Sequence, residues 1–197
     1  GTDGAMHKGW QTIGEDKYYF NSKGVMTKGW ATIDGNKYYF AKVSGKLATG
    51  WTTISGKKYY FDTDGVKQTG WITVGSNQYY LGTDGVRRTG WRTIDGNRYY
   101  FGKSKGQLYT GWATIGGKKY YLGTDGVMVT GKQTINGVVY EFGKDGVLKG
   151  KVEEQDKEPD KQPENDQTTK DNKSDNEDNT KSNLENNNVE QDTQVLE

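Results

Sequence analysis

Short runs of aromatic and β-branched residues alternate with polar residues along most of the chain, and glycines separate the runs. In the stretch GWATIDGNKYYF at 29–40, two such runs flank Asp34-Gly35, a dipeptide that accepts the positive φ of a tight hairpin turn. Equivalent dipeptides are Ser55-Gly56, Asp95-Gly96, Gly116-Gly117 and Asn136-Gly137. No window shows the 3.6-residue apolar spacing of a helix. The pattern therefore predicts β-hairpins and an all-β fold.

The hairpin pattern repeats every 20 or 21 residues. Each unit opens with a Gly-Trp pair, and these tryptophans are Trp10, Trp30, Trp51, Trp71, Trp91 and Trp112. A seventh unit follows at Gly131, where Lys132 replaces the tryptophan and the unit is expected to act as a cap. One hairpin of this size is marginal alone, so the units must stack and bury a shared face. We predict a solenoid of stacked β-hairpin repeats of 20–21 residues over residues 1–150.

Each unit carries two adjacent tyrosines, and adjacent strand residues point to opposite faces. Tyr38 therefore shares a face with Phe40, whereas Tyr39 shares the other face with Lys37. If the solenoid has one interior, one aromatic set lines it and the other faces grooves between hairpins. Flat rings with polar edges suit the faces of sugars. We expect the Phe and Ile series to form the core and the Trp and second Tyr series to bind ligand; a core made of all the rings is the alternative.

The unit GW-x-TI-x-G-K-YYF-x-x-x-G-x-x-x-TG resembles the cell-wall-binding repeats of choline-binding modules, streptococcal glucan-binding domains and clostridial toxin C-terminal domains. The resemblance covers residues 1 to about 150. It implies a stacked-hairpin solenoid that binds carbohydrate or choline, without catalysis, as the anchoring part of a secreted bacterial surface protein. The implied partner is a bacterial cell-wall or extracellular polysaccharide, with host-surface glycan as a second class. A choline (teichoic-acid) binding module and a structural stalk or adhesin spacer are the alternatives.

The residue before each tyrosine pair departs from the choline-binding pattern, in which the resemblance implies an aromatic. In this chain the position holds Lys17, Lys37, Lys58, Gln78, Arg98, Lys119 and Val139. A cation beside the aromatic cage disfavours a quaternary ammonium, and it can donate hydrogen bonds to hydroxyls or meet an anionic wall polymer. The predicted ligand-binding residues are Trp10, Trp30, Trp51, Trp71, Trp91, Trp112, Tyr19, Tyr39, Tyr60, Tyr80, Tyr100, Tyr121, Lys37, Lys58, Arg98 and Lys119.

Composition divides the chain near residue 150. Residues 1–150 carry 21 Lys and Arg against 11 Asp and Glu, whereas residues 151–197 carry 6 against 15 and no aromatic residue. A segment with so little apolar surface cannot offset the entropy of ordering, so we expect 151–197 to be a disordered acidic tail. The basic, aromatic repeats make nucleic acid a rival partner, although the cations occupy one position per hairpin and do not cluster.

No constellation of catalytic, metal-ligating or cofactor-binding residues stands out. His7 is the only histidine, there is no cysteine, and Asp62-Thr63-Asp64-Gly65 lacks the spacing of a calcium loop. No apolar run approaches the roughly 18 residues of a membrane span. The opening GTDGAMHKGW matches GTDGVRRTGW at 82–91, so we expect a fragment that begins in mid-repeat and can follow an upstream catalytic domain.

Overall fold

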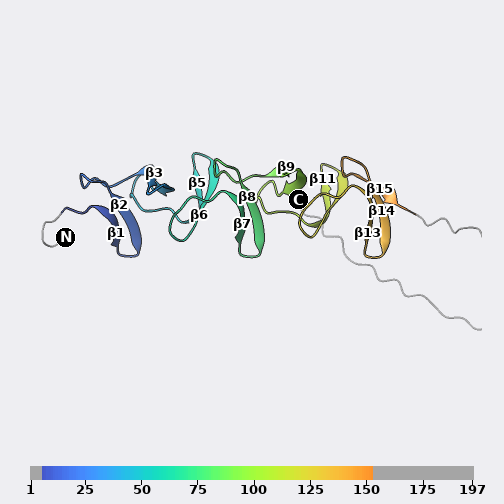
Figure 1. Ribbon diagram of the computed structural model, residues 1–197, viewed down its shortest axis with the longest axis horizontal. Helices are drawn as coiled ribbons and strands as arrows, with labels where there is room; N and C mark the ends of the chain where they lie inside the picture. The colour runs from blue at the N-terminus through green and yellow to red at the C-terminus, as the bar shows by residue number, and fades with distance from the viewer. Residues whose placement is uncertain (1–5, 153–197) are drawn as a thin grey trace, which may run out of the picture. The chain divides into compact units, whose positions relative to one another are not determined.

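The chain folds into a series of β-hairpins. The computed structural model describes residues 6–152, and within this range it contains strands and no helix (Figure 1). Seven antiparallel strand pairs follow one another, and a last strand joins the seventh pair to make a three-stranded sheet. The strands are β1 (Gly9–Ile13), β2 (Asp16–Phe20), β3 (Gly29–Ile33), β4 (Asn36–Phe40), β5 (Gly50–Ile54), β6 (Lys57–Phe61), β7 (Gly70–Val74), β8 (Asn77–Leu81), β9 (Gly90–Ile94), β10 (Asn97–Phe101), β11 (Gly111–Ile115), β12 (Lys118–Leu122), β13 (Gly131–Ile135), β14 (Val138–Phe142) and β15 (Leu148–Lys151).

The hairpins turn on the dipeptides that the sequence singles out. The first turn residue of four hairpins is not glycine and yet has a φ between 49° and 51°; these residues are Asp34, Ser55, Asp95 and Asn136. A glycine with positive φ follows each of them, and Gly116-Gly117 has positive φ at both positions. Two consecutive positive φ angles define the type I′ turn that matches the twist of paired strands. The predicted turns are therefore confirmed.

The turns fix a register that gives each hairpin two different faces. In the second hairpin Trp30 lies opposite Tyr39, and Thr32 lies opposite Lys37. We call the face with the tryptophan, the second tyrosine and the basic residue the front face. The back face carries the first tyrosine and the closing Phe or Leu, here Tyr38 and the fully buried Phe40.

Successive hairpins stack front face to back face. The Trp10 ring centroid of the first hairpin lies 5.0 Å from that of Tyr38 and 5.8 Å from that of Phe40 in the second. The same inter-hairpin Trp–Tyr contact recurs in Trp30–Tyr59, Trp51–Tyr79, Trp71–Tyr99, Trp91–Tyr120 and Trp112–Tyr140. The prediction of an all-β fold of stacked hairpin repeats is confirmed.

The core differs from the single interior that the sequence suggests, because it lies between each pair of neighbouring hairpins. Its fully buried side chains are Phe40, Phe61, Leu81, Phe101, Leu122 and Phe142. Thin hairpins bury both of their faces, so both tyrosine series have a place in the stack. The predicted isoleucine core holds at Ile33, Ile54, Ile94 and Ile135, which are 7% exposed. Ile13 is 54% exposed, because no hairpin within the described residues covers the back of the first one.

The loop after each hairpin ties that hairpin to the previous one. In the loop 41–49, the backbone N–H of Leu47 donates to the carbonyl of Lys17 in β2 of the first hairpin, at 2.9 Å. The equivalent hydrogen bonds are Lys67 to Lys37, Arg87 to Lys58, Leu108 to Gln78 and Met128 to Arg98. The same loop residue covers a glycine of the next loop: a Cβ on Gly65 would lie 2.6 Å from Leu47. Five successive loops therefore contact both the preceding hairpin and the following loop through this one position.

Within residues 6–152 no helix is long and apolar enough to cross a membrane. The predicted acidic tail at 151–197 falls outside the described residues except for Lys151, which ends β15, and Val152.

Candidate binding grooves

Two hollows of the described surface lie between hairpins, beside tryptophans. One measures about 420 Å³ and is lined by Trp51, Lys58, Tyr79, Arg87, Ser104 and Lys105. The other measures about 290 Å³ and is lined by Trp10, Gln11, Thr12, Lys17, Tyr38 and Asp64. We call these hollows the Trp51 groove and the Trp10 groove. Both have an aromatic wall from each of two hairpins, so the stack itself creates them.

The two grooves share a construction that the repeat carries along the chain. One hairpin supplies the Trp and the basic position, which precedes its own tyrosine pair. The next hairpin supplies the first tyrosine of its pair. The loop that follows this hairpin supplies the residue that covers the glycine of the next loop, and we call this residue the loop position. The loop after that supplies a residue just before its own glycine, which we call the rim position; it is Asp64 in the Trp10 groove and Lys105 in the Trp51 groove. A complete groove therefore uses three consecutive hairpin units.

The remaining grooves follow from the same register. The Trp30 groove combines Trp30, Lys37, Tyr59, Lys67 and Asp84; the Trp71 groove combines Trp71, Gln78, Tyr99, Leu108 and Asp125; the Trp91 groove combines Trp91, Arg98, Tyr120, Met128 and Asp145. Their aromatic walls are alike, whereas their charged positions differ. Any difference in ligand preference between grooves must therefore come from the basic, loop and rim positions.

The tryptophan rings remain accessible although they pack on two tyrosines each. Trp10, Trp30, Trp71 and Trp112 are 36–41% exposed, and Trp51 and Trp91 are half-buried. An exposed ring that is rigidly held by neighbours is suited to stacking against an apolar ligand face. The ligand-facing role of the six tryptophans stays a prediction.

Four of the six tryptophan rings already have a cation above them. The charged groups of Lys37, Arg98 and Lys119 lie 5.8, 4.6 and 5.1 Å from the ring centroids of Trp30, Trp91 and Trp112. The Arg87 guanidinium lies 5.8 Å from the centroid of Trp51. These distances are within the range of cation–π attraction, about 6 Å. The chain's own side chains therefore place a positive charge near these rings, which disfavours a bound ammonium there.

The predicted tyrosines lie beside the grooves, whereas the other tyrosine series lines them. Tyr19, Tyr39, Tyr60, Tyr80, Tyr100 and Tyr121 each contact the tryptophan directly opposite in their own hairpin, with centroids 5.1–5.2 Å apart. Tyr100 is only 7% exposed and packs edge-on against Tyr109. The groove-lining Tyr38 and Tyr79 belong to the first tyrosine of the pair. Sequence reasoning missed that series, because it assigned the back face to a closed interior.

Of the predicted cations, Lys58 lines the Trp51 groove, and Lys37, Arg98 and Lys119 lie over tryptophan rings. The loop position was missed altogether. When the repeats are aligned, this position is apolar in four of them, at Met26, Leu47, Leu108 and Met128. It is a cation in two others, at Lys67 and Arg87. That difference is the signal that could have found them.

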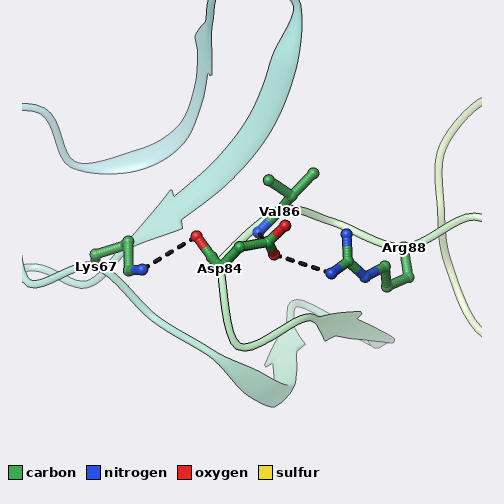
Figure 2. Close-up of polar contacts among 4 residues, drawn as sticks. All are labelled: Lys67, Asp84, Val86 and Arg88. Carbon is green, nitrogen blue, oxygen red and sulfur yellow. Dashed lines mark hydrogen bonds and ion pairs between the residues drawn. The ribbon is translucent and has the colours of Figure 1, made fainter.

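Lys67 is held by the loop that follows it. Its ammonium donates to the carbonyl of Asp84 at 3.1 Å, and the Asp84 carboxylate accepts from Arg88 at 3.0 Å and from the N–H of Val86 at 2.9 Å (Figure 2). Burial and the charge of nearby Lys37 lower the pKa of Lys67 below its ordinary value. Burial opposes ionisation of Asp84, but the Val86 N–H and Arg88 together leave its pKa lowered. The Trp30 groove therefore has two mutually repelling cations beside a carboxylate that is already hydrogen-bonded to Arg88.

Arg87 is fixed in the Trp51 groove by two backbone carbonyls. Its Nη1 and Nη2 donate to the carbonyls of Lys105 and Ser104, at 2.5 and 2.8 Å. Its Nε is buried and has no hydrogen-bond partner. Burial lowers the pKa of the guanidinium, although an arginine stays charged at neutral pH. Within residues 6–152, neither Arg87 nor Lys58 nor Lys105 forms an ion pair with a carboxylate.

The seventh hairpin lacks the groove chemistry. Lys132 stands where the other units have tryptophan, and it lies opposite Glu141, where they have the second tyrosine. Glu141 accepts a hydrogen bond from Lys149 in the neighbouring strand β15 at 2.8 Å, and this bond lowers the pKa of the carboxyl. A charged front face beside a third strand ends the aromatic series, as expected of a capping unit.

The comparisons with known proteins agree with this architecture. The family model described as "choline-binding repeat" matches residues 7–49, 48–85, 68–110 and 109–151. A comparison with curated proteins finds no match.

Three solved structures of Streptococcus pneumoniae proteins are similar to the chain. Choline-binding protein F, determined in the presence of a peptidoglycan analogue, is 35% identical, with a TM-score of 0.69 over 74% of this chain and 47% of its own. CbpJ is 30% identical, with a TM-score of 0.68 over 74% and 59%. The modular autolysin LytC is 28% identical, with a TM-score of 0.54 over 72% and 33%. The chain thus spans roughly half of the first two proteins.

Proposed function

Since this chain belongs to the choline-binding repeat family, we propose that its repeats attach a secreted bacterial protein to the polysaccharide of the cell wall or of an extracellular glucan. Residues 1–150 form the binding module in this proposal, and the ligand lies in the grooves between hairpins. The protein would then be retained at the bacterial surface by its repeats.

The pairing of Trp51 with Tyr79 across two hairpins, beside Lys58, carries the proposal. Two aromatic rings offer apolar walls to the faces of a sugar, and the ammonium of Lys58 can donate hydrogen bonds to its hydroxyls. The shared construction presents similar aromatic walls at each step of the stack. A polysaccharide also presents equal epitopes at regular steps, so it is a natural ligand of such a surface.

Repetition compensates for the weakness of a single groove. One stacked ring contributes only about 0.5–1.5 kcal/mol beyond area burial, so we expect a single groove to bind at roughly millimolar strength, near −4 kcal/mol. Each engagement after the first is intramolecular, which can raise the avidity by about 10²–10⁴. The choline-binding protein F structure was determined with a tetrasaccharide-pentapeptide analogue of peptidoglycan, which makes peptidoglycan a reasonable first polymer to test.

The experiment is cosedimentation of the full chain with purified bacterial walls and, separately, with insoluble α-glucan. We expect the wild-type chain to sediment with at least one polymer. Replacing Trp51, Trp71 and Trp91 together by alanine should reduce the affinity for the polymer by a factor far larger than three times the factor for a single replacement. Val43→Ala is the control, because Val43 is 90% exposed in a loop and lines neither hollow. A folded triple variant that still sediments contradicts the groove proposal, and a wild type that binds no polymer, host glycans included, favours the spacer alternative.

Choline is a second candidate for one groove. The Trp71 groove has Gln78 at the basic position and Leu108 at the loop position, and among residues 6–152 no cation lies over the Trp71 ring. Its rim position holds Asp125, a favourable neighbour for an ammonium. Walls stripped of choline, compared with intact walls, separate the candidates. Retention on stripped walls favours saccharide binding, and loss of binding together with elution by millimolar choline favours choline.

A further inference from the structure

We propose that the Trp51 groove is a subsite selective for an anionic sugar, one whose pyranose ring stacks on Trp51 and Tyr79 while its phosphate or carboxylate meets Lys58, Arg87 and Lys105. This inference rests on the proposed function, because it specifies the ligand of one of the same grooves.

Charge distinguishes this groove from the others. It has a cation at the basic, loop and rim positions, and none of the three is paired with a carboxylate within residues 6–152. In the Trp10 groove the rim position is Asp64, whose carboxylate lies 3.8 Å from the ammonium of Lys17. In the Trp71 groove none of the equivalent positions is a cation. Three unpaired cations lining one hollow favour an anionic ligand.

Arg87 provides a fixed positive charge beside the aromatic wall. The two loop carbonyls hold its guanidinium within 5.8 Å of the Trp51 ring centroid. Neutral carbonyls orient the group but do not neutralise it, and its buried Nε has no partner. A planar guanidinium held in this way is suited to an oxyanion, with which it forms hydrogen bonds stronger than those of neutral pairs. Burial of Arg87 also disfavours its charge and lowers its pKa, so a bound anion would stabilise the folded protein.

The positive charge at the rim position comes from the sequence of the loop 102–110. In four other loops the residue before the equivalent glycine is aspartate: Asp64, Asp84, Asp125 and Asp145. This loop instead reads GKSKG, with Lys105 at that position and Lys103 two residues before it. The carbonyls that fix Arg87 come from the same loop. The loop that reverses the rim charge therefore also positions the second cation.

The test follows the six indole N–H signals of the full chain by NMR, assigned with single Trp→Phe variants. Five of these signals each report on one complete groove, and the signal of Trp112 serves as an internal comparison. The probes are glucose, glucose 6-phosphate, glucuronate and inorganic phosphate. We expect the Trp51 signal to respond to the phosphate or carboxylate sugar at a concentration at least about tenfold lower than to glucose, because hydrogen bonds to charged groups contribute more binding free energy than neutral ones. Comparing glucose 6-phosphate with glucuronate identifies which anion is preferred. The response should weaken as salt is added.

A charge transplant provides the matched control. Lys58→Gln, Arg87→Leu and Lys105→Asp install at the Trp51 groove the residue types of the Trp71 groove, and they should abolish the preference for the anionic sugar. The converse set, Gln78→Lys, Leu108→Arg and Asp125→Lys, should create that preference at Trp71. Every substituted residue type already occurs at the same position elsewhere in the repeat, and circular dichroism checks the fold.

Three outcomes overturn the inference. One is an equal response of all six indoles to the anionic sugars, and another is an unchanged Trp51 response in the folded transplant variant. The third is a Trp51 response to a single-stranded oligonucleotide at lower concentration than to either sugar, which would mean a nucleic-acid site. None of these outcomes affects the cosedimentation of the wild type, so the proposed function can survive the failure of this inference. Loss of cosedimentation would refute the proposed function separately.

Discussion

Trp10 of the first hairpin and Tyr38 of the second form an edge-to-face pair, with ring centroids 5.0 Å apart and ring planes inclined by 68°. Trp10 meets Tyr19 of its own hairpin at 5.2 Å in a similar orientation. The tryptophan is thus held between two tyrosines, one from each side of the hairpin junction. It belongs to the packing of the stack and to the wall of a groove at once, so its replacement affects stability and binding together.

Tyr79 offers a way to separate these two effects. Tyr79→Ala removes one wall of the Trp51 groove and one aromatic pair worth about 0.5–1.5 kcal/mol beyond area burial. We expect both weaker polysaccharide binding and a lower free energy of unfolding, measured by cosedimentation and urea titration. Tyr79→Phe should retain the stability and lose only what the hydroxyl contributes to binding. Equal binding by wild type and Tyr79→Ala would show that the first tyrosine is not a ligand wall.

The stability lost on substituting a glycine by alanine should depend on what the new Cβ would contact. Gly65 has a φ of +82°, and a Cβ there would lie 2.6 Å from Leu47; Gly75, in a hairpin turn, has a φ of +61° and nothing within 4 Å. Both alanine variants lose about 1–2 kcal/mol to the left-handed backbone. Gly65→Ala should lose about 1–3 kcal/mol more, because the contact between loops must open. Thermal and urea unfolding of the two variants provide the comparison, and equal losses would mean that the loop contact adapts freely.

Phe61 tests whether the core lies between hairpins. It is fully buried, with its ring centroid 5.9 Å from that of Trp30 in the preceding hairpin. Phe61→Ala should lower the free energy of unfolding by about 3–5 kcal/mol. Phe61→Leu should cost less than about 1.5 kcal/mol, because Leu81 and Leu122 occupy the same position in other hairpins. If alanine costs no more than leucine in urea unfolding, the position is not part of a packed core.

Asp84 predicts a pH dependence of stability. Its pKa in the folded chain is lowered by the Val86 N–H and Arg88 against the opposing effect of burial. A carboxyl with a lowered folded pKa contributes stability above its unfolded pKa, about 3.9, and that contribution is lost as the pH falls through the folded value. The Tm of wild type should therefore exceed that of Asp84→Asn at neutral pH, and the difference should shrink toward zero below about pH 4. A Tm difference that persists at low pH would assign the effect to packing.

Much of the fold could be predicted from a few residues per unit. Asp34-Gly35 and its equivalents specify the turn, and the turn sets the register that places Trp30 opposite Tyr39. Strand alternation then decides which residues share a face. These are local properties of about twelve consecutive residues, and local rules are sufficient for them.

The grooves could be predicted only in part, because they form between units that are distant in sequence. Alternation shows that Tyr38 and Tyr39 point apart, but it does not show that Tyr38 meets Trp10 of the previous hairpin. That meeting depends on the loop, through the hydrogen bond from Leu47 to Lys17. Arg87 was missed for the same reason, since its role in the Trp51 groove follows from the position of the loop 102–110.

The three-unit construction of a groove sets the valency of the module. A complete groove takes its tryptophan from one hairpin, its tyrosine from the next and its rim from the loop of the one after. Two hairpins alone would offer no complete groove, and three would offer one. The seven described hairpins accordingly form five. Each inserted repeat would add a groove whose character depends on its two neighbours as much as on its own residues, so moving a repeat along the array would change what it recognises without changing a single one of its amino acids.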